Sequence, residues 1–168
     1  MFPISHFNIT RTPFYYYDKT LLSNTLAKLI RLAGERNYHI HYAVKANANP
    51  EILKLIAASG IGADCVSGGE IKAALEAGFP AKKIVFAGVG KADWEIEYAL
   101  EKKIFCFNVE SAEELSVIEE LAKKKENIAS IALRINPNID AHTHEYITTG
   151  LSENKFGIPI EMLSLIHI

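Results

Sequence analysis

The sequence predicts an α/β fold built of repeated βα units around a parallel sheet. Segments with apolar residues at helical spacing alternate regularly with short runs of β-branched and aromatic residues. The 168 residues are 49% hydrophobic and 23% charged, which is enough apolar surface for a sizeable core. Five predicted strands do not close an eight-stranded barrel, which typically needs about 250 residues. We therefore expect residues 1–168 to form one incomplete domain, about the first five βα units of a (β/α)8 barrel of the TIM type.

The elements follow in chain order from these patterns. The first helix is marked by apolar residues at helical spacing, namely Leu22, Leu26, Leu29, Ile30 and Ala33. Runs rich in β-branched and aromatic residues predict strands at 38–44, 61–66, 84–86, 104–108 and 130–135. The helices between them are expected to begin at about Pro50, Gly68, Asp93 and Ser111.

Three of these helix starts have capping residues. Asn49 precedes Pro50, which fits a cap followed by proline at the first helical position. The other two have a serine followed three residues later by glutamate, the capping-box pattern, in the pairs Ser67 with Glu70 and Ser111 with Glu114. These residues predict where each strand-to-helix turn ends.

The composition excludes several classes of function. The formal net charge is -2 and the pI about 6.3, so nucleic acid is not expected as a partner. No apolar run approaches the roughly 18 residues of a membrane span, and no secretory leader is evident, so the expected location is the cytoplasm. Cys65 and Cys106 both lie in strand-like runs and are expected to be buried reduced thiols.

Lys45 is the best candidate for a covalent cofactor anchor. It follows a short apolar strand, and the carboxyl ends of parallel strands are where α/β enzymes keep their reactive groups. Strand alternation places Ala43 on the same side, which leaves space beside the amine for a flat ring. An amine partly removed from water attacks aldehydes, of which pyridoxal phosphate is the usual one. The alternative is a surface lysine that closes a strand.

Asp64 and Arg134 are the other candidate site residues, at the ends of the second and fifth strands. Arg134 shares its parity with Ala132 and is expected to point into the barrel lumen, where it needs an anionic or aromatic partner. Arg134 could form an ion pair with Asp64 or Glu110, or it could contact the cofactor directly, and the sequence does not decide between these roles. Asp64 either caps a turn or orients the amine of Lys45, and we favour the second role.

Two further motifs give weak indications. The segment Gly88–Lys91 suggests a phosphate loop but lacks the glycine spacing and the Lys-Ser/Thr ending of a nucleotide loop. His142 and His144 have a spacing found in metal sites, although such a pair on a polar loop more often faces solvent or substrate. No metal is therefore expected.

Several motifs occur in order along the chain, namely Tyr42–Asn47, Gly62–Glu70, Phe86–Lys91, Phe107–Ser111 and Arg134–Pro137. Together they resemble the barrel domain of one enzyme family, the alanine-racemase-like pyridoxal-phosphate decarboxylases. Within that family, Asn136–Gly150 with Lys155–Ile158 is most similar to the diaminopimelate decarboxylases. The match extends to about Met162.

The resemblance implies a function and a set of partners. Lys45 would hold pyridoxal 5'-phosphate, and the substrate would be the amino acid meso-2,6-diaminopimelate, decarboxylated to L-lysine in lysine biosynthesis. Family members have a second, β-rich domain and act as homodimers whose active sites use both subunits. That domain and the family's remaining cofactor-binding residues would lie beyond residue 168. We therefore expect this chain to be inactive alone.

Three other interpretations remain open. The chain could belong to another decarboxylase of basic amino acids, acting on ornithine, arginine or carboxynorspermidine. It could be a non-catalytic barrel protein that binds pyridoxal phosphate, or a structural βα repeat in which Lys45 is incidental. A separate hypothesis concerns residues 163–168. The DNA of a common sequencing adapter would encode these six residues, and in that case they are a non-native tail.

Overall fold

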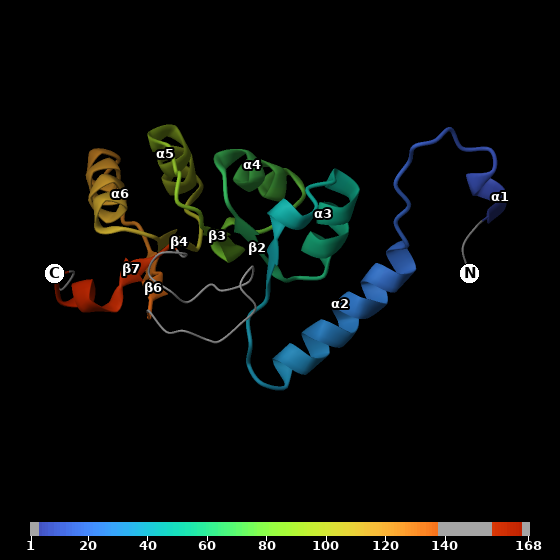
Figure 1. Cartoon of the computed structure of the whole chain (residues 1–168), viewed down its shortest axis with the longest axis horizontal. Helices are drawn as coiled ribbons and strands as arrows, with labels where there is room; N and C mark the ends of the chain where they lie inside the picture. Colours follow the sequence, from blue (N-terminus) through green and yellow to red (C-terminus); the bar gives the residue numbers. More distant parts are fainter. Residues whose placement is uncertain (1–3, 138–155, 166–168) are drawn as a thin grey trace.

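The computed structural model describes residues 4–137 and 156–165. It contains a parallel sheet of five strands in sequence order, each joined to the next by a helical connection (Figure 1). The strands are β1 (His41–Ala43), β2 (Gly62–Cys65), β3 (Ile84–Phe86), β4 (Cys106–Val109) and β5 (Ile131–Leu133). The predicted five-stranded parallel sheet with alternating helices is confirmed.

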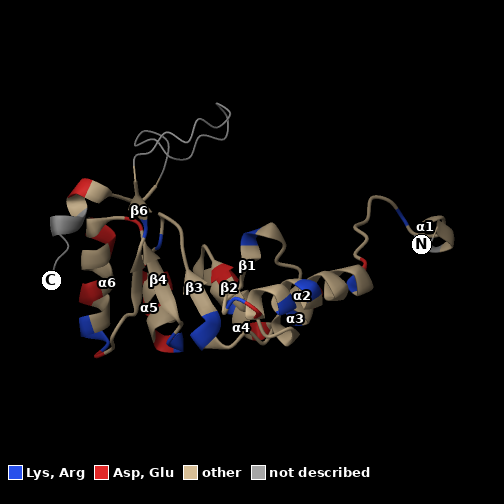
Figure 2. Cartoon of the chain, turned by 90° about the horizontal axis from the view of Figure 1, so that it is seen from below, with Lys and Arg blue, Asp and Glu red and all other residues tan. Residues whose placement is uncertain are grey.

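The helices lie mostly on one side of the sheet. Helices α3 (Pro50–Ala58), α4 (Gly68–Glu76), α5 (Asp93–Lys102) and α6 (Ala112–Lys124) form a row, and α2 (Lys19–Gly34) extends away from it toward the short α1 (Ile4–Phe7) (Figure 1). On α6 the basic residues gather at the C-terminal end and acidic residues begin the helix, the order that the helix dipole favours (Figure 2). No helix in the described ranges is both long and apolar enough to cross a membrane.

The core lies between the sheet and this row of helices. Phe86 of β3 and Phe107 of β4 are almost fully buried, and their ring centroids are 6.0 Å apart. The helices contribute Leu53, Ile71, Ile96 and Ile118, each at most 1% exposed. Both cysteines are free and buried, as predicted.

The strand register decides which residues share the opposite face of the sheet. Ala43 pairs with Asp64, and Asp64 pairs with Val85. Neighbours in register point to the same side of a sheet. Asp64 therefore lies on the face away from the buried Ala63 and Cys65, the face that lines the lumen of a closed barrel.

Two predicted strands end earlier than expected. β1 stops at Ala43, and Val44–Ala46 form a 3₁₀ turn that is held by a hydrogen bond from the Asn47 amide to the Val44 carbonyl, 3.1 Å. The prediction of one strand over 130–135 was also wrong, because β5 ends at Leu133. The chain then enters a separate two-stranded sheet of β6 (Ile135–Asn136) and β7 (Ile158–Pro159).

The capping predictions are confirmed, with one difference in detail. Ser67 and Ser111 accept hydrogen bonds from the amides of Glu70 and Glu114, at 3.2 and 3.1 Å. Each glutamate, however, bonds the amide one residue before the serine, not the amide of the serine itself. The capping glutamate of α6 therefore fixes the residue that directly follows β4.

Candidate functional site

Lys45 lies at the carboxyl end of β1, within the 3₁₀ turn of residues 44–46. Val44 is completely buried and anchors the turn, whereas Lys45 is exposed. The expectation of a partly buried amine that continues the strand alternation was therefore wrong, since the strand ends two residues before Lys45. The position at the carboxyl end is as predicted, and the amine is accessible to a ligand.

Asp64 lies on the neighbouring strand, in register with Ala43. Its Oδ1 atom is buried and has no hydrogen-bond partner among the described residues. Burial raises the pKa of the Asp64 carboxyl, and the charges of Lys45 and His41 oppose this rise. Ala43 is in register with Asp64 and Lys45 follows Ala43 by two residues, so Lys45 is close enough to act on this carboxyl electrostatically. A buried carboxylate oxygen without a partner is rare in folded proteins and suggests a missing ligand group.

Two more titratable residues share this face with Asp64. The His41 ring stacks on Phe105 with 6.2 Å between centroids, and burial lowers the pKa of the imidazole, with Asp64 acting in the opposite direction. Burial raises the pKa of the Cys106 thiol, and the negative charge of Asp64 adds to this effect. Asp64 is thus the acidic centre of the lumen face of β1, β2 and β4.

Arg134 follows β5 and pairs with Glu110, one of the two carboxylates considered from the sequence. Its Nη1 atom lies 3.0 and 2.9 Å from the two carboxylate oxygens. The Glu110 side chain is 3% exposed and that of Arg134 is 39% exposed. Arg134 therefore neutralises a buried acid, while its side chain as a whole stays partly exposed. A direct contact with a cofactor stays a prediction.

The sequence did not reveal how the other strand ends are linked. The Lys91 side chain is 1% exposed and its ammonium bonds the carbonyls of Gly88 and Asn108 and the carboxylate of Glu114. The ammonium is therefore already engaged, which argues against the phosphate-loop interpretation of Gly88–Lys91. The capping-box pattern predicted that Glu114 lies at the start of α6, near the end of β4. Nothing in the sequence indicated that Glu114 also binds Lys91.

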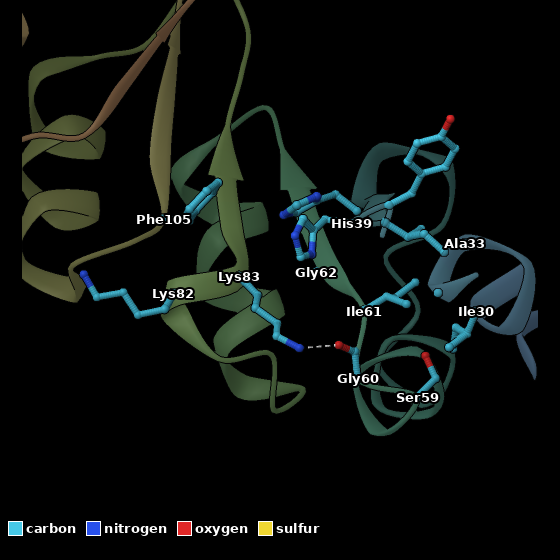
Figure 3. Close-up of a pocket in the computed structure, with 14 residues that line it drawn as sticks. Ile30, Ala33, His39, Ser59, Gly60, Ile61, Gly62, Lys82, Lys83 and Phe105 are labelled. Atoms are coloured by element: carbon cyan, nitrogen blue, oxygen red, sulfur yellow. Dashed lines mark hydrogen bonds between the residues drawn. The ribbon is translucent and has the colours of Figure 1, made fainter. Parts of the chain in front are cut away.

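A separate cavity lies at the other end of the sheet. Its volume is about 420 Å³, and its lining comes from residues at or before the starts of β1 to β4, including Ile30, Ile61 and Phe105. Figure 3 shows Lys83 at its edge, where the ammonium bonds the Gly60 carbonyl at 2.6 Å. Because Lys45 follows β1 at its opposite end, this cavity is not part of the candidate site.

Some residues that the sequence analysis considered lie outside the described residues. This applies to His142 and His144, and to the segment after Pro137 that favoured diaminopimelate as the substrate. Lys45, Asp64 and Arg134 all lie at or near the carboxyl ends of their strands, where a ligand of a parallel sheet is expected.

Residues 23–167 match the family model described as the pyridoxal-binding domain of pyridoxal-dependent decarboxylases. The chain belongs to this family. Among curated relatives of this decarboxylase family, the chain is 62% identical over 162 residues to the diaminopimelate decarboxylase of Bacteroides thetaiotaomicron, covering 96% of the chain and 42% of the relative. It is 51% identical to that of Helicobacter pylori J99, covering 90% and 38%.

Solved structures of diaminopimelate decarboxylases in complex with L-lysine are similar to the structure of this chain. The H. pylori enzyme superposes with a TM-score of 0.82 at 47% identity, covering 97% of this chain and 41% of the other. The M. jannaschii enzyme gives a TM-score of 0.82 at 40% identity, covering 94% and 38%. The five-stranded sheet thus corresponds to part of the barrel of these enzymes, and the chain spans about two fifths of the length of its relatives.

Proposed function

We propose that Lys45, Asp64 and Arg134 form part of a pyridoxal-phosphate site, and that the enzyme containing this chain decarboxylates meso-2,6-diaminopimelate to L-lysine. The observation that supports this most directly is the buried, unpaired Oδ1 of Asp64 close to the accessible amine of Lys45. The family match to a pyridoxal-binding domain supports the choice of cofactor.

The residues present fit the cofactor by the chemistry of their donor and acceptor atoms. Lys45 provides the amine that joins the aldehyde, and Ala43, on the lumen face of β1, leaves room for a flat ring. The unpaired Oδ1 of Asp64 would be free to accept a hydrogen bond from that amine or from the cofactor, and so to orient it. The exposed part of Arg134 offers positive charge to an anionic group. When bound, pyridoxal phosphate supplies the electron sink that accepts the electron pair left by carbon dioxide.

The choice of substrate rests on the relatives. Those reported above are diaminopimelate decarboxylases, and two of their structures contain L-lysine, which is the product of the proposed reaction. We also propose that the enzyme acts in lysine biosynthesis in the cytoplasm as a homodimer. The additional length of the relatives supports the expectation that residues outside this chain complete the active site.

The proposal is tested by measuring carbon dioxide release from meso-diaminopimelate, ornithine and arginine. We expect a longer protein that includes this chain and the downstream coding sequence to decarboxylate diaminopimelate preferentially. The 168-residue chain alone should release none. Lys45→Ala should abolish the activity, and Lys54→Ala, which removes an exposed lysine of α3, should retain it. A preference for ornithine or arginine, or full activity of Lys45→Ala, would contradict the proposal.

A further inference from the structure

Lys91 is a buried cation at the carboxyl ends of β3 and β4. Its side chain is 1% exposed, and its ammonium lies 5.3 Å from the centre of the Phe86 ring. It donates to the Gly88 carbonyl at 2.6 Å, to the Asn108 carbonyl at 2.9 Å and to Glu114 Oε1. An ammonium has three donors, and each has a partner here. Lys91 is therefore held in a single position by its own loop, by β4 and by α6.

Two of these partners connect Lys91 to Glu110. The other carboxylate oxygen of Glu114, Oε2, accepts the Glu110 amide at 2.7 Å. The amide of Gly88, whose carbonyl binds Lys91, donates to Glu110 Oε1 at 3.3 Å. Gly88 has a φ of +100°, a backbone conformation that residues other than glycine rarely adopt. This conformation directs the Gly88 carbonyl to Lys91 and the Gly88 amide to Glu110. Lys91 thus fixes both the backbone and the carboxylate of Glu110.

Glu110 in turn holds Arg134. Both oxygens of its buried carboxylate lie within 3.0 Å of Arg134 Nη1. We propose that Lys91 is a positioning residue that acts through Glu114 and Glu110 to fix the guanidinium of Arg134 for the anionic part of the cofactor. This inference rests on the proposed function for the role of Arg134. The contacts from Lys91 to Arg134 are independent of it.

Loss of Lys91 has a definite expected effect. Without the ammonium, Glu114 keeps a largely buried carboxylate, 14% exposed, with no cation beside it, and the loop at Gly88 loses its anchor. Glu110 and Arg134 then sample more positions. Partners that orient metal ligands typically change affinity by about 10- to 100-fold. Lys91 acts on Arg134 through two intervening residues, Glu114 and Glu110, so we expect the lower end of that range, with pyridoxal-phosphate binding about tenfold weaker.

The first test does not need the cofactor. Folded wild type and Lys91→Met are treated with a dicarbonyl reagent that modifies guanidinium groups, and the modified peptides are quantified. Arg134 should react several-fold faster in Lys91→Met, while the exposed Arg31 serves as an internal reference of constant rate. The control Lys123→Met removes an exposed ion-paired lysine of α6 and should leave Arg134 unchanged. An unchanged Arg134 rate in Lys91→Met overturns the inference.

A second variant covers the case in which Lys91→Met does not fold. Lys91→Met with Glu114→Gln removes both charges of the buried pair and avoids an isolated carboxylate. It also replaces the carboxylate that binds the Glu110 amide. Faster modification of Arg134 in this double variant supports the inference, and a wild-type rate contradicts it.

The third test is a double-mutant cycle on pyridoxal-phosphate affinity, measured by fluorescence titration of the full chain. Lys91→Met should weaken binding about tenfold in the wild type and have no effect in an Arg134→Ala background, because Lys91 acts only through Arg134. Additive effects would show a general structural role and refute the inference. Absence of binding by the wild type would instead count against the proposed function, and the reactivity of Arg134 would still decide the positioning role.

Discussion

Asp64→Asn tests whether the chain keeps a buried charge at the expense of its own stability. Asp64 Oδ1 is buried without a hydrogen-bond partner, and burial raises the pKa of the carboxyl. An unsatisfied buried polar group costs about 1–3 kcal/mol, and more when it is charged, so a neutral amide at this position costs less than the carboxylate. Because Asp64 is only half-buried and Lys45 and His41 oppose the effect, the lower end of this range applies. We expect Asp64→Asn to raise the free energy of unfolding at pH 7 by about 1 kcal/mol.

The pH dependence of this effect has a definite sign. The pKa of Asp64 is higher in the folded than in the unfolded chain, so the destabilisation is absent below the unfolded value of about 3.9. It develops as the pH rises from that value through the raised folded pKa, and it is complete above it. The advantage of Asp64→Asn should therefore be present at pH 7 and disappear in acid.

Urea unfolding of the cofactor-free chain, followed by circular dichroism, measures this difference. With a slope of about 2 kcal/mol per molar urea, a change of about 1 kcal/mol moves the midpoint by about 0.5 M. Glu119→Gln, which removes an exposed acid of α6, should change the midpoint by much less. A midpoint for Asp64→Asn equal to or below the wild type at pH 7, or an increase that persists in acid, would refute the reasoning.

Two further predictions concern the backbone around the sheet. Gly62→Ala should lower the stability by about 1–3 kcal/mol, because the added Cβ would lie 2.5 Å from the Lys83 carbonyl and against the His41 ring. The control is Gly69→Ala, whose added Cβ has its nearest contact at 3.7 Å. Equal urea midpoints for the two variants would contradict the prediction. Glu95→Gln should cost about 1–3 kcal/mol, because both carboxylate oxygens accept backbone amides, from Gly68 at 2.6 Å and Ala92 at 2.9 Å. Thermal unfolding measures this loss of stability, and an unchanged melting midpoint would show that the Glu95 carboxylate does not stabilise the fold through these amides.

The order of strands and helices could be predicted from the sequence because it depends on local patterns. Apolar spacing and the serine–glutamate boxes located α4 and α6 within one residue of their observed starts. The position of Lys45 after β1 and its proximity to Asp64 followed from the rule that parallel strands align their carboxyl ends.

The detailed contacts of the site could not be predicted in this way. Two carboxylates were available to Arg134, and the choice of Glu110 depends on how far β5 extends before the chain leaves the sheet. The exposure of Lys45 depends on a 3₁₀ turn that ends the strand alternation. The burial of Lys91 depends on Asn108 and Glu114, two acceptors distant in the sequence that no local pattern brings to its loop.

The central claim is that Lys45 is the lysine that binds pyridoxal phosphate. Borohydride reduction of the protein with the cofactor, followed by peptide mapping, tests it directly. We expect the label on Lys45, with little on exposed lysines such as Lys54 and Lys72, and no comparable labelling in Lys45→Arg. An unlabelled Lys45, or a label spread evenly over the exposed lysines, would contradict the account.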